Sequence, residues 1–555
     1  MKKTQLKIVP LGGMGHVTQN MFLYEYGDEI LIVDCGIGFP DTHMPGVDIL
    51  IPDAAYLMQR LDQGATIAGM ILSHGHDDHI AALPYMLPHL PEFPIYASPL
   101  TAGFAEQRMS DGKVTRPVTT IKDEKPFKIG SHFSAYLIPV THSVPDTRHI
   151  VIETPEGLVY HGSDFKLDKA PVDGVLSDMK AVEALKDKDV LLMLIDCLRI
   201  EYDEWVKSES TVGPTIDAIM AETEGKLVMT LMSSHLHRIQ QTIDAAEKHG
   251  RQVVFIGRSV EQNVDVALRL KKLHIPQGMK VDKKHIDQVR DNELCVIVAG
   301  SQGQEGSSLV RAIYGEHRIL QIRPQDTVVF SADAIPGNEL TFYGAIDELS
   351  RNNVHVVYPA IRDNLHQSGH ASLPEQKTMV EAVRPRFLMP IGGADRHRVL
   401  FYHKVAEELG YDETNTLLPE DGEVLGFSNK SWTVTDKLSL RPQIVDGLGV
   451  GDVGPVVLSD RKVLGQSGIV VVVVPRVNSE FDLSRMHVIS KGFVFMKNAD
   501  EVVEFIKTKT AEVISNPKDY KNDAQLTQLI EKRLARKLFK IIRREPLIVP
   551  VILDL

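Results

Sequence analysis

The densest group of potential metal ligands in the chain is a run of six residues, His74 to His79, in the order His-Gly-His-Asp-Asp-His. Neutral imidazole and carboxylate are the ligands that zinc prefers in proteins. The run follows a segment typical of a buried strand and precedes a helical pattern at residues 80–90. A loop between a strand and a helix can direct these side chains toward two neighbouring points. We therefore expect two metal ions, the first bound by His74 and His76 and the second by Asp78 and His79.

Two ions need further ligands, and a carboxylate often bridges them. His142 and Asp164 each stand at the end of a strand-like run and could supply these ligands. Either could instead be a structural residue, so both alternatives stay open at this point. Asp34 also ends a strand-like run, and we expect it to orient a metal-bound histidine.

The elements that must position these residues follow an alternating pattern. Short apolar runs in the first 200 residues, such as residues 20–26 and 29–36, predict strands, and the candidate ligands stand at strand ends. Amphipathic patterns at residues 210–225 and 237–250 alternate with short strands and predict a second α/β unit. A final region from about residue 450 combines strand patterns with two helical stretches.

Length and composition indicate a globular protein. With 555 residues, 43% of them hydrophobic and 24% charged, the chain should fold into about two to four domains. The longest aliphatic run, residues 469–474, is far shorter than the roughly 20 residues that span a membrane. The N-terminus lacks an apolar stretch of signal-peptide length, and the three cysteines are too far apart for a disulfide framework. We expect a cytoplasmic protein without membrane association.

The order of the candidate ligands resembles that of the metallo-β-lactamase superfamily. The resemblance implies six metal ligands: His74, His76, Asp78, His79, His142 and Asp164. In the superfamily the histidines other than His79 hold one ion, Asp78 and His79 hold the other, and Asp164 bridges them. Two such ions favour hydrolysis, because they activate a shared water and stabilise the attacking and leaving oxygens of a phosphoryl group.

An α/β insertion in such a fold, followed by the sequence HQSGHAS, resembles the β-CASP nucleases. Further stretches, among them PLGGMG, THSVPDT, HGSDFK and HRIQQTIDAAEKHGRQVVFIGRS, resemble the bacterial ribonuclease J family from about residue 8 to 475. The resemblance implies an α/β fold: a metallo-β-lactamase αββα sandwich with an inserted α/β β-CASP domain and a small α+β C-terminal domain. We place the two parts of the sandwich at residues 1–205 and 361–445, the β-CASP domain at 206–360 and the C-terminal domain at 450–555.

The same resemblance assigns catalytic roles to Asp78, Asp196 and His370. Asp196 matches an acidic motif that frames the catalytic centre, and His370 is placed to protonate the leaving oxygen. The implied substrate-binding residues are His366, Gln367, Ser368, Gly369, His370, Ser301, Ser331 and Arg258. The resemblance implies that residues 366–370 form the loop that binds the scissile phosphate. The last three would line the RNA path and a 5′-phosphate pocket, although a structural role stays open for each.

One departure from the family concerns the second ion. The family has a Pro-x-His-Gly-Glu motif where this chain reads Pro-Ile-Gly-Gly-Ala at residues 390–394. Gly392 therefore stands where the resemblance implies a histidine ligand. We expect the second ion to be held more weakly or to be completed by water, with His397 and Asp395 as nearby candidates. The expected cofactor is two Zn²⁺ per subunit, with Mn²⁺ or Mg²⁺ as substitutes.

Three further departures concern the RNA. Residues 196–203 read DCLRIEYD where the family has a Ser-Thr-Asn run, His235 replaces an Asn, and Asp333 stands in a normally serine-rich turn. The expected substrate is RNA with a 5′-monophosphate. These departures leave the preference for that end open.

The net charge of −13 argues against nucleic-acid binding by bulk electrostatics. Metal ions, backbone amides and local basic segments can still neutralise phosphates. One basic segment contains Lys532, Arg533, Arg536, Lys537, Lys540, Arg543 and Arg544. Its spacing also suits a solvated helix face, which is the favoured interpretation.

Three hypotheses follow. The first is a metal-dependent ribonuclease with 5′-to-3′ exonuclease and endonuclease activity in RNA maturation and mRNA decay, acting as a homodimer or higher oligomer. The second is a catalytically weakened RNA-binding subunit that assembles with an active paralogue or an RNA-degradation complex. Gly392 favours it, and the complete run from His74 to His79 counts against it. The third, a small-molecule thioester or lactone hydrolase, is disfavoured by the large insertion.

Overall fold

The computed structural model describes residues 4–41, 43–122, 125–335, 337–447, 449–493 and 499–555. The chain forms two compact units, one of Met1–Gly38 with Ile51–Gln443 and one of Phe39–Leu50 with Ile444–Leu555. The first unit contains all the candidate ligands.

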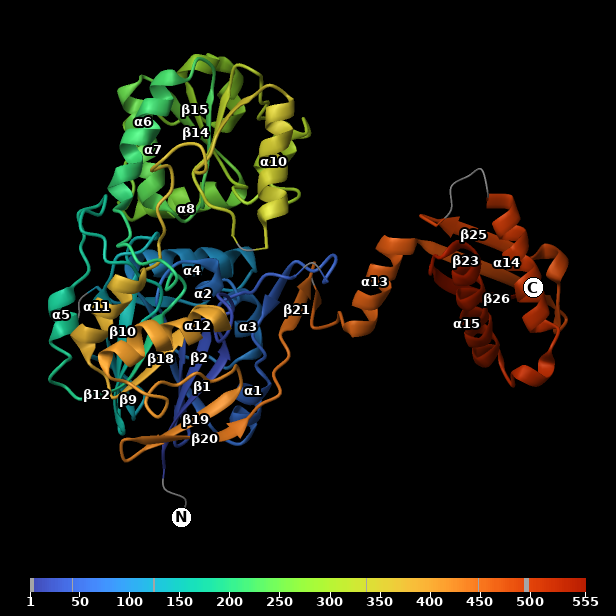
Figure 1. Ribbon diagram of the computed structural model, residues 1–555, viewed down its shortest axis with the longest axis horizontal. Helices are drawn as coiled ribbons and strands as arrows, with labels where there is room; N and C mark the ends of the chain where they lie inside the picture. The colour runs from blue at the N-terminus through green and yellow to red at the C-terminus, as the bar shows by residue number, and fades with distance from the viewer. Residues whose placement is uncertain (1–3, 42, 123–124, 336, 448, 494–498) are drawn as a thin grey trace. The chain divides into compact units, whose positions relative to one another are not determined.

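An eight-stranded sheet forms one layer of the first unit (Figure 1). Its strands, in spatial order, are β20 (Ser431–Lys437), β19 (Glu423–Ser428), β1 (Leu6–Gly12), β2 (Met21–Tyr26), β3 (Glu29–Val33), β5 (Thr66–Leu72), β6 (Ile95–Ala97) and β7 (Val118–Thr120). Strands β3, β5, β6 and β7 run parallel, so their carboxyl ends lie at one edge of the sheet.

A six-stranded sheet forms the second layer. Its strands, in spatial order, are β18 (Phe387–Ile391), β12 (Val190–Asp196), β11 (Gly157–His161), β10 (Arg148–Thr154), β9 (Phe133–Pro139) and β8 (Phe127–Ile129). Strands β11, β12 and β18 run parallel. Every residue of β12 is buried, as its continuous apolar sequence predicts for a strand that is covered on both faces.

The core of the sandwich lies between the two sheets. Leu6, Ile8 and Tyr24 of the first sheet pack in one cluster with Ile150 and Leu194 of the second. These residues alternate along their strands with residues that face the other way, which is the period-two pattern of a strand. Each large apolar side chain buried here contributes about 1.5–3 kcal/mol.

Helices lie on the outer sides of both sheets (Figure 1). They are α1 (Ala55–Asp62), α2 (Asp77–Ile80), α3 (Leu83–Met86) and α4 (Pro99–Asp111) beside the first sheet, and α5 (Met179–Glu183), α11 (Leu373–Val383) and α12 (Asp395–Phe401) beside the second. Met379 and Phe401 pack on Met193 and Ile195 of β12. The predicted αββα sandwich is confirmed.

The helical pattern predicted at residues 80–90 is interrupted. Helix α2 ends at Ile80, α3 spans only Leu83–Met86, and a 3₁₀ turn follows at Leu87–His89. Pro84 and Pro88 are the second residues of these short pieces, and a proline lacks the N–H that a continuous helix requires. The sequence expectation of one helix was therefore wrong at this point.

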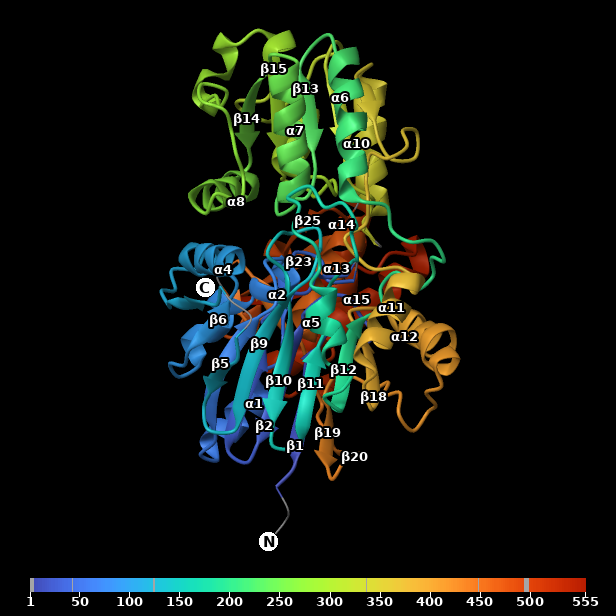
Figure 2. The same cartoon turned by 90° about the vertical axis from the view of Figure 1, so that its left-hand side faces the viewer.

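The inserted domain is a separate five-stranded parallel sheet with helices on both faces (Figure 2). Its strands, in spatial order, are β14 (Gln252–Ile256), β15 (Leu294–Val298), β13 (Leu227–Thr230), β16 (Thr327–Phe330) and β17 (His355–Val357). Its helices are α6 (Val212–Glu222), α7 (Leu236–Lys248), α8 (Arg258–Arg269), α9 (Ser308–Ile313) and α10 (Glu339–Arg351). This confirms the predicted second α/β unit.

The topology brings distant chemical residues to one edge of the sandwich. Asp34 follows β3, His74 follows β5, Asp164 follows β11, and Asp196 ends β12. Gly392 follows β18. Because the carboxyl ends of parallel strands share an edge, these residues lie close together although the sequence separates them.

The second unit has a small three-stranded sheet and a larger one. The former contains β22 (Gly449–Val450), β21 (Gln443–Asp446) and β4 (Ile49–Ile51), and the latter contains β24 (Glu480–Phe481), β23 (Ile469–Val477), β25 (His487–Lys491) and β26 (Leu547–Asp554). Its helices are α13 (Pro455–Ser467), α14 (Ala499–Ile514) and α15 (Asp523–Ile542). Val470 and Val472 of β23 pack on Ile530 and Leu534 of α15. Among the described residues, no helix is long and apolar enough to cross a membrane.

Candidate metal centre

Three histidine side chains converge on one point beyond the end of β5. Nδ1 of His76 lies 3.1 Å from Nε2 of His74 and 3.1 Å from Nε2 of His142. All three side chains are buried. Nitrogen ligands of one tetrahedral zinc ion, each about 2.0–2.1 Å from the metal, lie about 3.3 Å apart. The three nitrogens are therefore spaced as ligands of a single ion.

Two of these imidazoles are oriented through their outer ring nitrogens. The Nδ1–H of His142 donates to the Gly369 carbonyl at 2.7 Å, and Nδ1 of His74 lies 3.0 Å from the hydroxyl of Ser73. Such outer contacts fix the ring and leave the inner nitrogen free to bind a metal.

Asp164 joins this group of ligands to a second one. Its Oδ2 lies 3.5 Å from Nε2 of His74 and 3.7 Å from Nε2 of His142 and of His79. Asp78 Oδ2 lies 3.7 Å from the same nitrogen of His79. Asp164 belongs to three candidate groups: one with His74, His76 and His142, a second with Asp78 and His79, and a third with Asp196 and His370. In each group the ligand atoms lie within 4.8 Å of one another. Asp164 is thus placed to bridge two ions.

Asp34 holds His79 by the ring nitrogen that faces away from the second group. The Nδ1–H of His79 donates to Asp34 Oδ2 at 2.7 Å, and Asp34 also accepts from the backbone N–H and the hydroxyl of Ser73, each at 2.7 Å. Asp34 has a φ of +61°, which is uncommon for a non-glycine residue and characteristic of strained backbone at functional sites. Its carboxylate therefore fixes the orientation of the His79 ring.

Gly392 faces the second group without contributing to it. A Cβ built on Gly392 would lie 3.6 Å from Asp196 Oδ1 and 3.8 Å from Asp164 Oδ1. A side chain here would therefore lie beside the carboxylates of Asp196 and Asp164. Among the described residues, neither His397 nor Asp395 belongs to a ligand group, because His397 Nε2 lies 3.6 Å from Glu201 and Asp395 pairs with Arg398.

His370 lies above Asp164 and is held by Asp196. The distance from His370 Nδ1 to Asp196 Oδ2 is 2.8 Å, and His370 Nε2 lies 3.9 Å from Asp164 Oδ2. Asp196 is buried, whereas 20% of the His370 side chain is exposed. The carboxylate thus turns the second nitrogen of His370 toward the ligand groups.

The pKa values separate the ligands into two kinds. Burial and the neighbouring imidazoles lower the pKa of His74, His76 and His142, so these rings are neutral, which is the form that binds metal. Burial raises the pKa of Asp164 to about 7.

His79 and His370 have the opposite shift. Burial lowers the pKa of His79, but the nearby carboxylates outweigh it and raise the value to about 10. Burial acts in the same direction on His370, and the carboxylates of Asp196 and Asp164 raise its pKa to about 9. These two imidazoles therefore carry positive charge that balances the carboxylates, and a bound cation would replace protons.

The loop of residues 366–370 packs directly on the first ligand group. A Cβ on Gly369 would lie 2.9 Å from Ser143 Cβ and 3.0 Å from His142 Cε1, so only glycine permits this approach. The backbone N–H of His370 donates to Ser368 Oγ at 3.1 Å. Gln367 Nε2 donates to Thr211 Oγ1 at 3.2 Å.

The three residues predicted for the RNA path lie at the ends of strands in the inserted domain. Ser331 follows β16 and donates its hydroxyl hydrogen to the Leu365 carbonyl at 2.7 Å. Ser301 is buried after β15, and Arg258 is exposed at the start of α8. In the described part of the chain, no hydrogen bond or ion pair joins these three side chains to one another, and their roles stay predictions.

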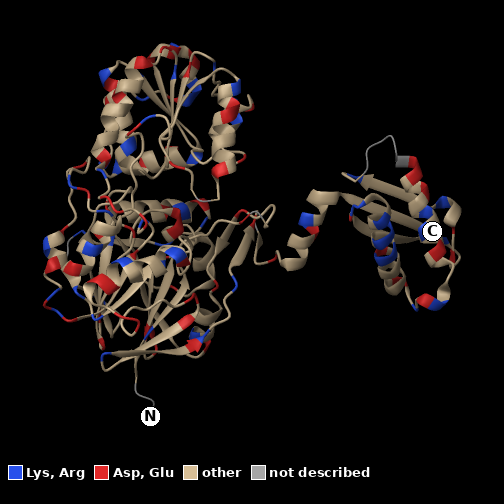
Figure 3. Cartoon of the chain, viewed as in Figure 1, with Lys and Arg blue, Asp and Glu red and all other residues tan. Residues whose placement is uncertain are grey.

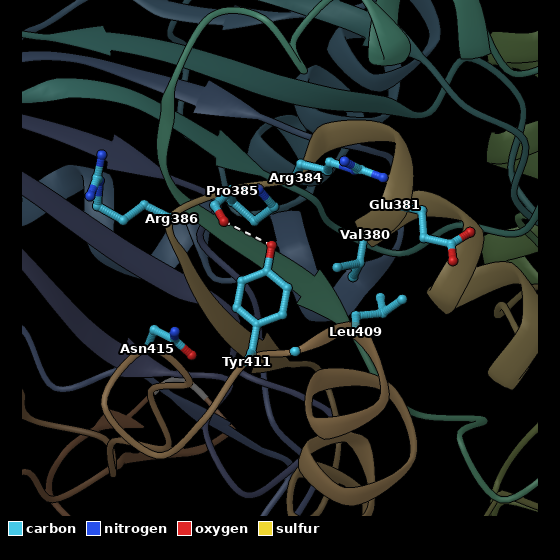
Figure 4. Close-up of a pocket in the computed structure, with 9 residues that line it drawn as sticks. Val380, Glu381, Arg384, Pro385, Arg386, Leu409, Tyr411 and Asn415 are labelled. Atoms are coloured by element: carbon cyan, nitrogen blue, oxygen red, sulfur yellow. Dashed lines mark hydrogen bonds between the residues drawn. The ribbon is translucent and has the colours of Figure 1, made fainter.

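A separate surface cavity of about 460 Å³ lies at the other end of β18 (Figure 4). Its lining includes Val380, Arg384 and Tyr411, whose hydroxyl donates to the Pro385 carbonyl at 2.8 Å. Pro385 precedes β18 and Gly392 follows it, so the cavity is remote from the ligand groups.

Several residues of the site carried no sequence signal. The hydroxyl of Ser143 lies 3.2 Å from His76 Nε2, and Asn20 Nδ2 lies 3.1 Å from His79 Nε2. Ser73 contacts both Asp34 and His74. Serine and asparagine are common, and only the folded chain reveals these contacts.

Known proteins match the whole chain. Family models match at residues 30–255 (beta-lactamase superfamily domain), 224–349 (Ribonuclease J, beta-CASP domain) and 456–555 (Ribonuclease J C-terminal domain). Ribonuclease J 1 of Streptococcus pyogenes is 31% identical over 561 residues, which cover 100% of this chain and 98% of the relative. Ribonuclease J of Thermus thermophilus is 32% identical, with coverage of 99% and 95%.

A solved structure shares the fold. It is a protein of unknown function from Enterococcus faecalis, with a TM-score of 0.54, 16% sequence identity, and coverage of 76% of this chain and 100% of that chain. Together, the sandwich, its inserted parallel domain and the bridged His and Asp groups define a β-CASP protein with the metallo-β-lactamase fold. More narrowly, the sequence relationship over the full length shows that the chain belongs to the ribonuclease J family.

Proposed function

We propose that this protein is a metal-dependent ribonuclease that hydrolyses RNA phosphodiesters, with 5′-to-3′ exonuclease and endonuclease activity in RNA maturation and mRNA decay. The observation that supports it most is the 3.1 Å convergence of His74, His76 and His142, with Asp164 shared by a second ligand group. The relatives are named ribonucleases.

The donor set fits zinc. The first group offers three imidazoles and a carboxylate, as a tetrahedral zinc site requires, and the second offers an imidazole and two carboxylates. We propose two Zn²⁺ per subunit, the second more weakly held, with Mn²⁺ or Mg²⁺ as substitutes. Bound ions would supply an activated water and neutralise phosphate charge.

The side chains around the groups perform the remaining steps. Asp78 and Asp164 would provide negative charge to hold the cations, and Asp34 keeps His79 in position. Asp196 accepts the Nδ1–H of His370 and leaves its Nε2 free to give a proton to the leaving oxygen of the RNA. Backbone N–H groups of the 366–370 loop are proposed to bind the scissile phosphate.

We further propose that RNA with a 5′-monophosphate enters along Ser301, Ser331 and Arg258, and that the protein acts as a homodimer or higher oligomer. A cytoplasmic location fits the three cysteines, which are buried and unpaired, as in a reducing compartment.

One observation favours a second candidate function, a catalytically weakened subunit that assembles with an active paralogue. Gly392 leaves the second group with three protein ligands among the described residues, whereas the first has four. A loosely held second ion would reduce the rate of hydrolysis.

The test is incubation of purified protein with 5′-labelled RNA that carries either a 5′-monophosphate or a 5′-hydroxyl, in Mn²⁺ or Zn²⁺. His76→Ala is the matched control, because it removes the nitrogen that faces both other imidazoles. RNA loss in the unmutated protein alone supports the ribonuclease. Intact RNA that is nevertheless bound supports the weakened subunit.

A further inference from the structure

Arg238 is the largest of the fully buried side chains and lies in the inserted domain, near the start of α7. Burying a guanidinium costs several kcal/mol unless it is paired and hydrogen-bonded. Glu209, which is 2% exposed, provides that pair: Arg238 Nε donates to Oε1 at 2.8 Å and Nη2 donates to Oε2 at 2.7 Å. The nearby Arg238 charge holds the pKa of Glu209 well below its usual range despite burial.

The other three N–H groups of Arg238 contact two segments: the residue after β16 and the start of the 366–370 loop. Nη1 donates to the Ser331 carbonyl at 2.7 Å and to Nδ1 of His366 at 2.7 Å. Nη2 also donates to the Gln367 carbonyl at 3.3 Å. A guanidinium has five N–H donors and no acceptor, so each donor is used here.

This arrangement determines the protonation of His366. Because Arg238 can only donate, Nδ1 of His366 must accept, and the ring proton must be on Nε2. A protonated imidazole would set two N–H groups against each other. Burial and the charge of Arg238 act in the same sense, since both lower the pKa of His366.

The remaining nitrogen of His366 faces an exposed carboxylate, that of Asp333. Its Nε2 lies 3.7 Å from Asp333 Oδ2, and 17% of the His366 side chain is exposed, against 60% for Asp333. A neutral N–H at this position can donate to an anionic oxygen. His370, four residues further on, is held by a carboxylate, so the two histidines of the loop have partners of opposite charge.

We propose that Arg238 is a positioning residue that locks His366 in its Nε2–H form, so that His366 is a neutral hydrogen-bond donor to a phosphate oxygen of the substrate. In this arrangement His366 transfers no proton. The role rests on the proposed ribonuclease function for its substrate, but the locked form of the ring does not depend on turnover.

The first test is spectroscopic. The full chain labelled with ¹⁵N-histidine is compared with His366→Gln to assign the His366 ring signals. We expect a protonated Nε2 and an unprotonated Nδ1 at neutral pH, and a mixture of both forms in Arg238→Lys. A protonated Nδ1 in the unmutated protein would overturn the proposal.

The matched control is Arg251→Lys. Arg251 is also buried in the inserted domain, but it donates to the carbonyls of Thr223, Gly225 and Leu294 and does not contact the loop. It should lower stability and leave the His366 signals unchanged. If both variants change these signals equally, the effect of Arg238 is general unfolding and the proposal fails.

The second test measures kcat and KM with RNA for two variants of His366. His366→Gln keeps a neutral N–H donor without a titratable proton, and His366→Met keeps neither. A hydrogen bond to a charged group is worth about 1.5–3 kcal/mol, which is about 10- to 150-fold in rate. We expect kcat/KM to fall less than tenfold for Gln and by about a hundredfold for Met.

Equal losses in both variants would assign a proton-transfer role to His366 and overturn the proposal. If the unmutated protein cleaves no RNA with any metal, the proposed function fails instead, and the ring-proton measurement still decides the role of Arg238.

Discussion

Gly392 directly follows β18 and has a φ of +66°. Because it has no side chain, it leaves space beside Asp164 and Asp196. The space there is open at ordinary contact distance, so a side chain could enter with little steric conflict. The backbone conformation costs a non-glycine residue about 1–2 kcal/mol. A side chain at this one position could therefore add a ligand beside Asp164.

Replacing Gly392 with His is expected to lower the stability of the metal-free protein by about 1–2 kcal/mol and to tighten metal binding at the second group. Gly392→Ala is the control, because it has the same backbone cost and adds no ligand. The measurement is metal content after dialysis at low free Zn²⁺. Equal content in the two variants would show that position 392 does not reach the second ion.

The charged state of His79 and His370 leads to a pH prediction. Their pKa values of about 10 and about 9 lie above the ordinary value of 6.5, so the protonated rings stabilise the fold fully below about pH 6.5. This stabilisation is lost as pH rises through about 9 to 10. The pKa of Asp164 is raised to about 7, so its protonated form also stabilises the fold. This contribution is lost as pH rises from about 4 to about 7.

We therefore expect the melting temperature of metal-free protein to fall as pH rises from about 7 to 10, a range in which the histidines with lowered pKa are already neutral. We expect bound Mn²⁺ to reduce that slope because the cation replaces the protons. Thermal unfolding with and without metal measures this. The same slope in both conditions would contradict the assignment of these residues to a metal centre.

The grouping of the candidate ligands in the run His74 to His79 could be predicted because their spacing is local, and Asp34 could be expected to orient one of them because it ends a strand-like run. The other orienting contacts could not be predicted, because they depend on tertiary packing. His142 and Gly369, for example, are 227 residues apart in sequence. Likewise, nothing in the sequence near Arg238 indicates that its guanidinium ends beside His366.

At the scale of elements, helix α15 has one buried and one cationic face. Leu526, Ile530, Leu534 and Leu538 are buried at intervals of four residues. The opposite face carries exposed lysines and arginines (Figure 3). Arg533 pairs with Asp519, whereas Lys532, Arg536, Lys537 and Lys540 have no ion pair within the described residues.

Neutralising Lys532, Arg536, Lys537 and Lys540 to Gln tests whether this face is solvated or contacts RNA. We expect a change in unfolding free energy within about 0.5 kcal/mol, as for exposed positions without partners. If the face is solvated, the slope of log RNA affinity against log salt concentration is the same in the variant as in the unmutated protein. A reduction of the slope by about 3 to 4 would assign the face to RNA phosphates.

Leu534→Ala is the contrasting change on the buried face. It is expected to destabilise the second unit by about 2–5 kcal/mol, because it leaves a cavity next to Val470 and Val472. Denaturant unfolding measures the loss. A cost below about 1 kcal/mol would mean that the helix does not pack on β23 in solution.

Element bounds followed the sequence where patterns were uninterrupted. The pattern at residues 20–26 became β2, and that at 237–250 became α7. The run at residues 29–36 gave a shorter strand, β3, because Asp34 turns the chain with a positive φ. Such a turn depends on the contacts of Asp34 with Ser73 and His79.

For the whole molecule, the two compact units have separate hydrophobic clusters. All the candidate metal ligands belong to the first unit. A ligand stabilises the unit that binds it and leaves an independent unit unchanged.

Thermal unfolding of the full chain is therefore expected to show two transitions, of which added Zn²⁺ raises only one. Calorimetry measures both, and His76→Ala should remove the shift while leaving the other transition in place. A single transition that moves as a whole would show that the units unfold together.

Gly369 presents its carbonyl to His142 while its neighbours His366 and His370 frame the place proposed for the phosphate. Binding that orders the 366–370 loop also fixes the orientation of the His142 imidazole. In the same way, a cation bound to His142 would order the loop. By thermodynamic reciprocity, an ion that favours RNA binding must itself be retained more tightly by the same factor once RNA is present. The metal would then dissociate most readily from the RNA-free protein.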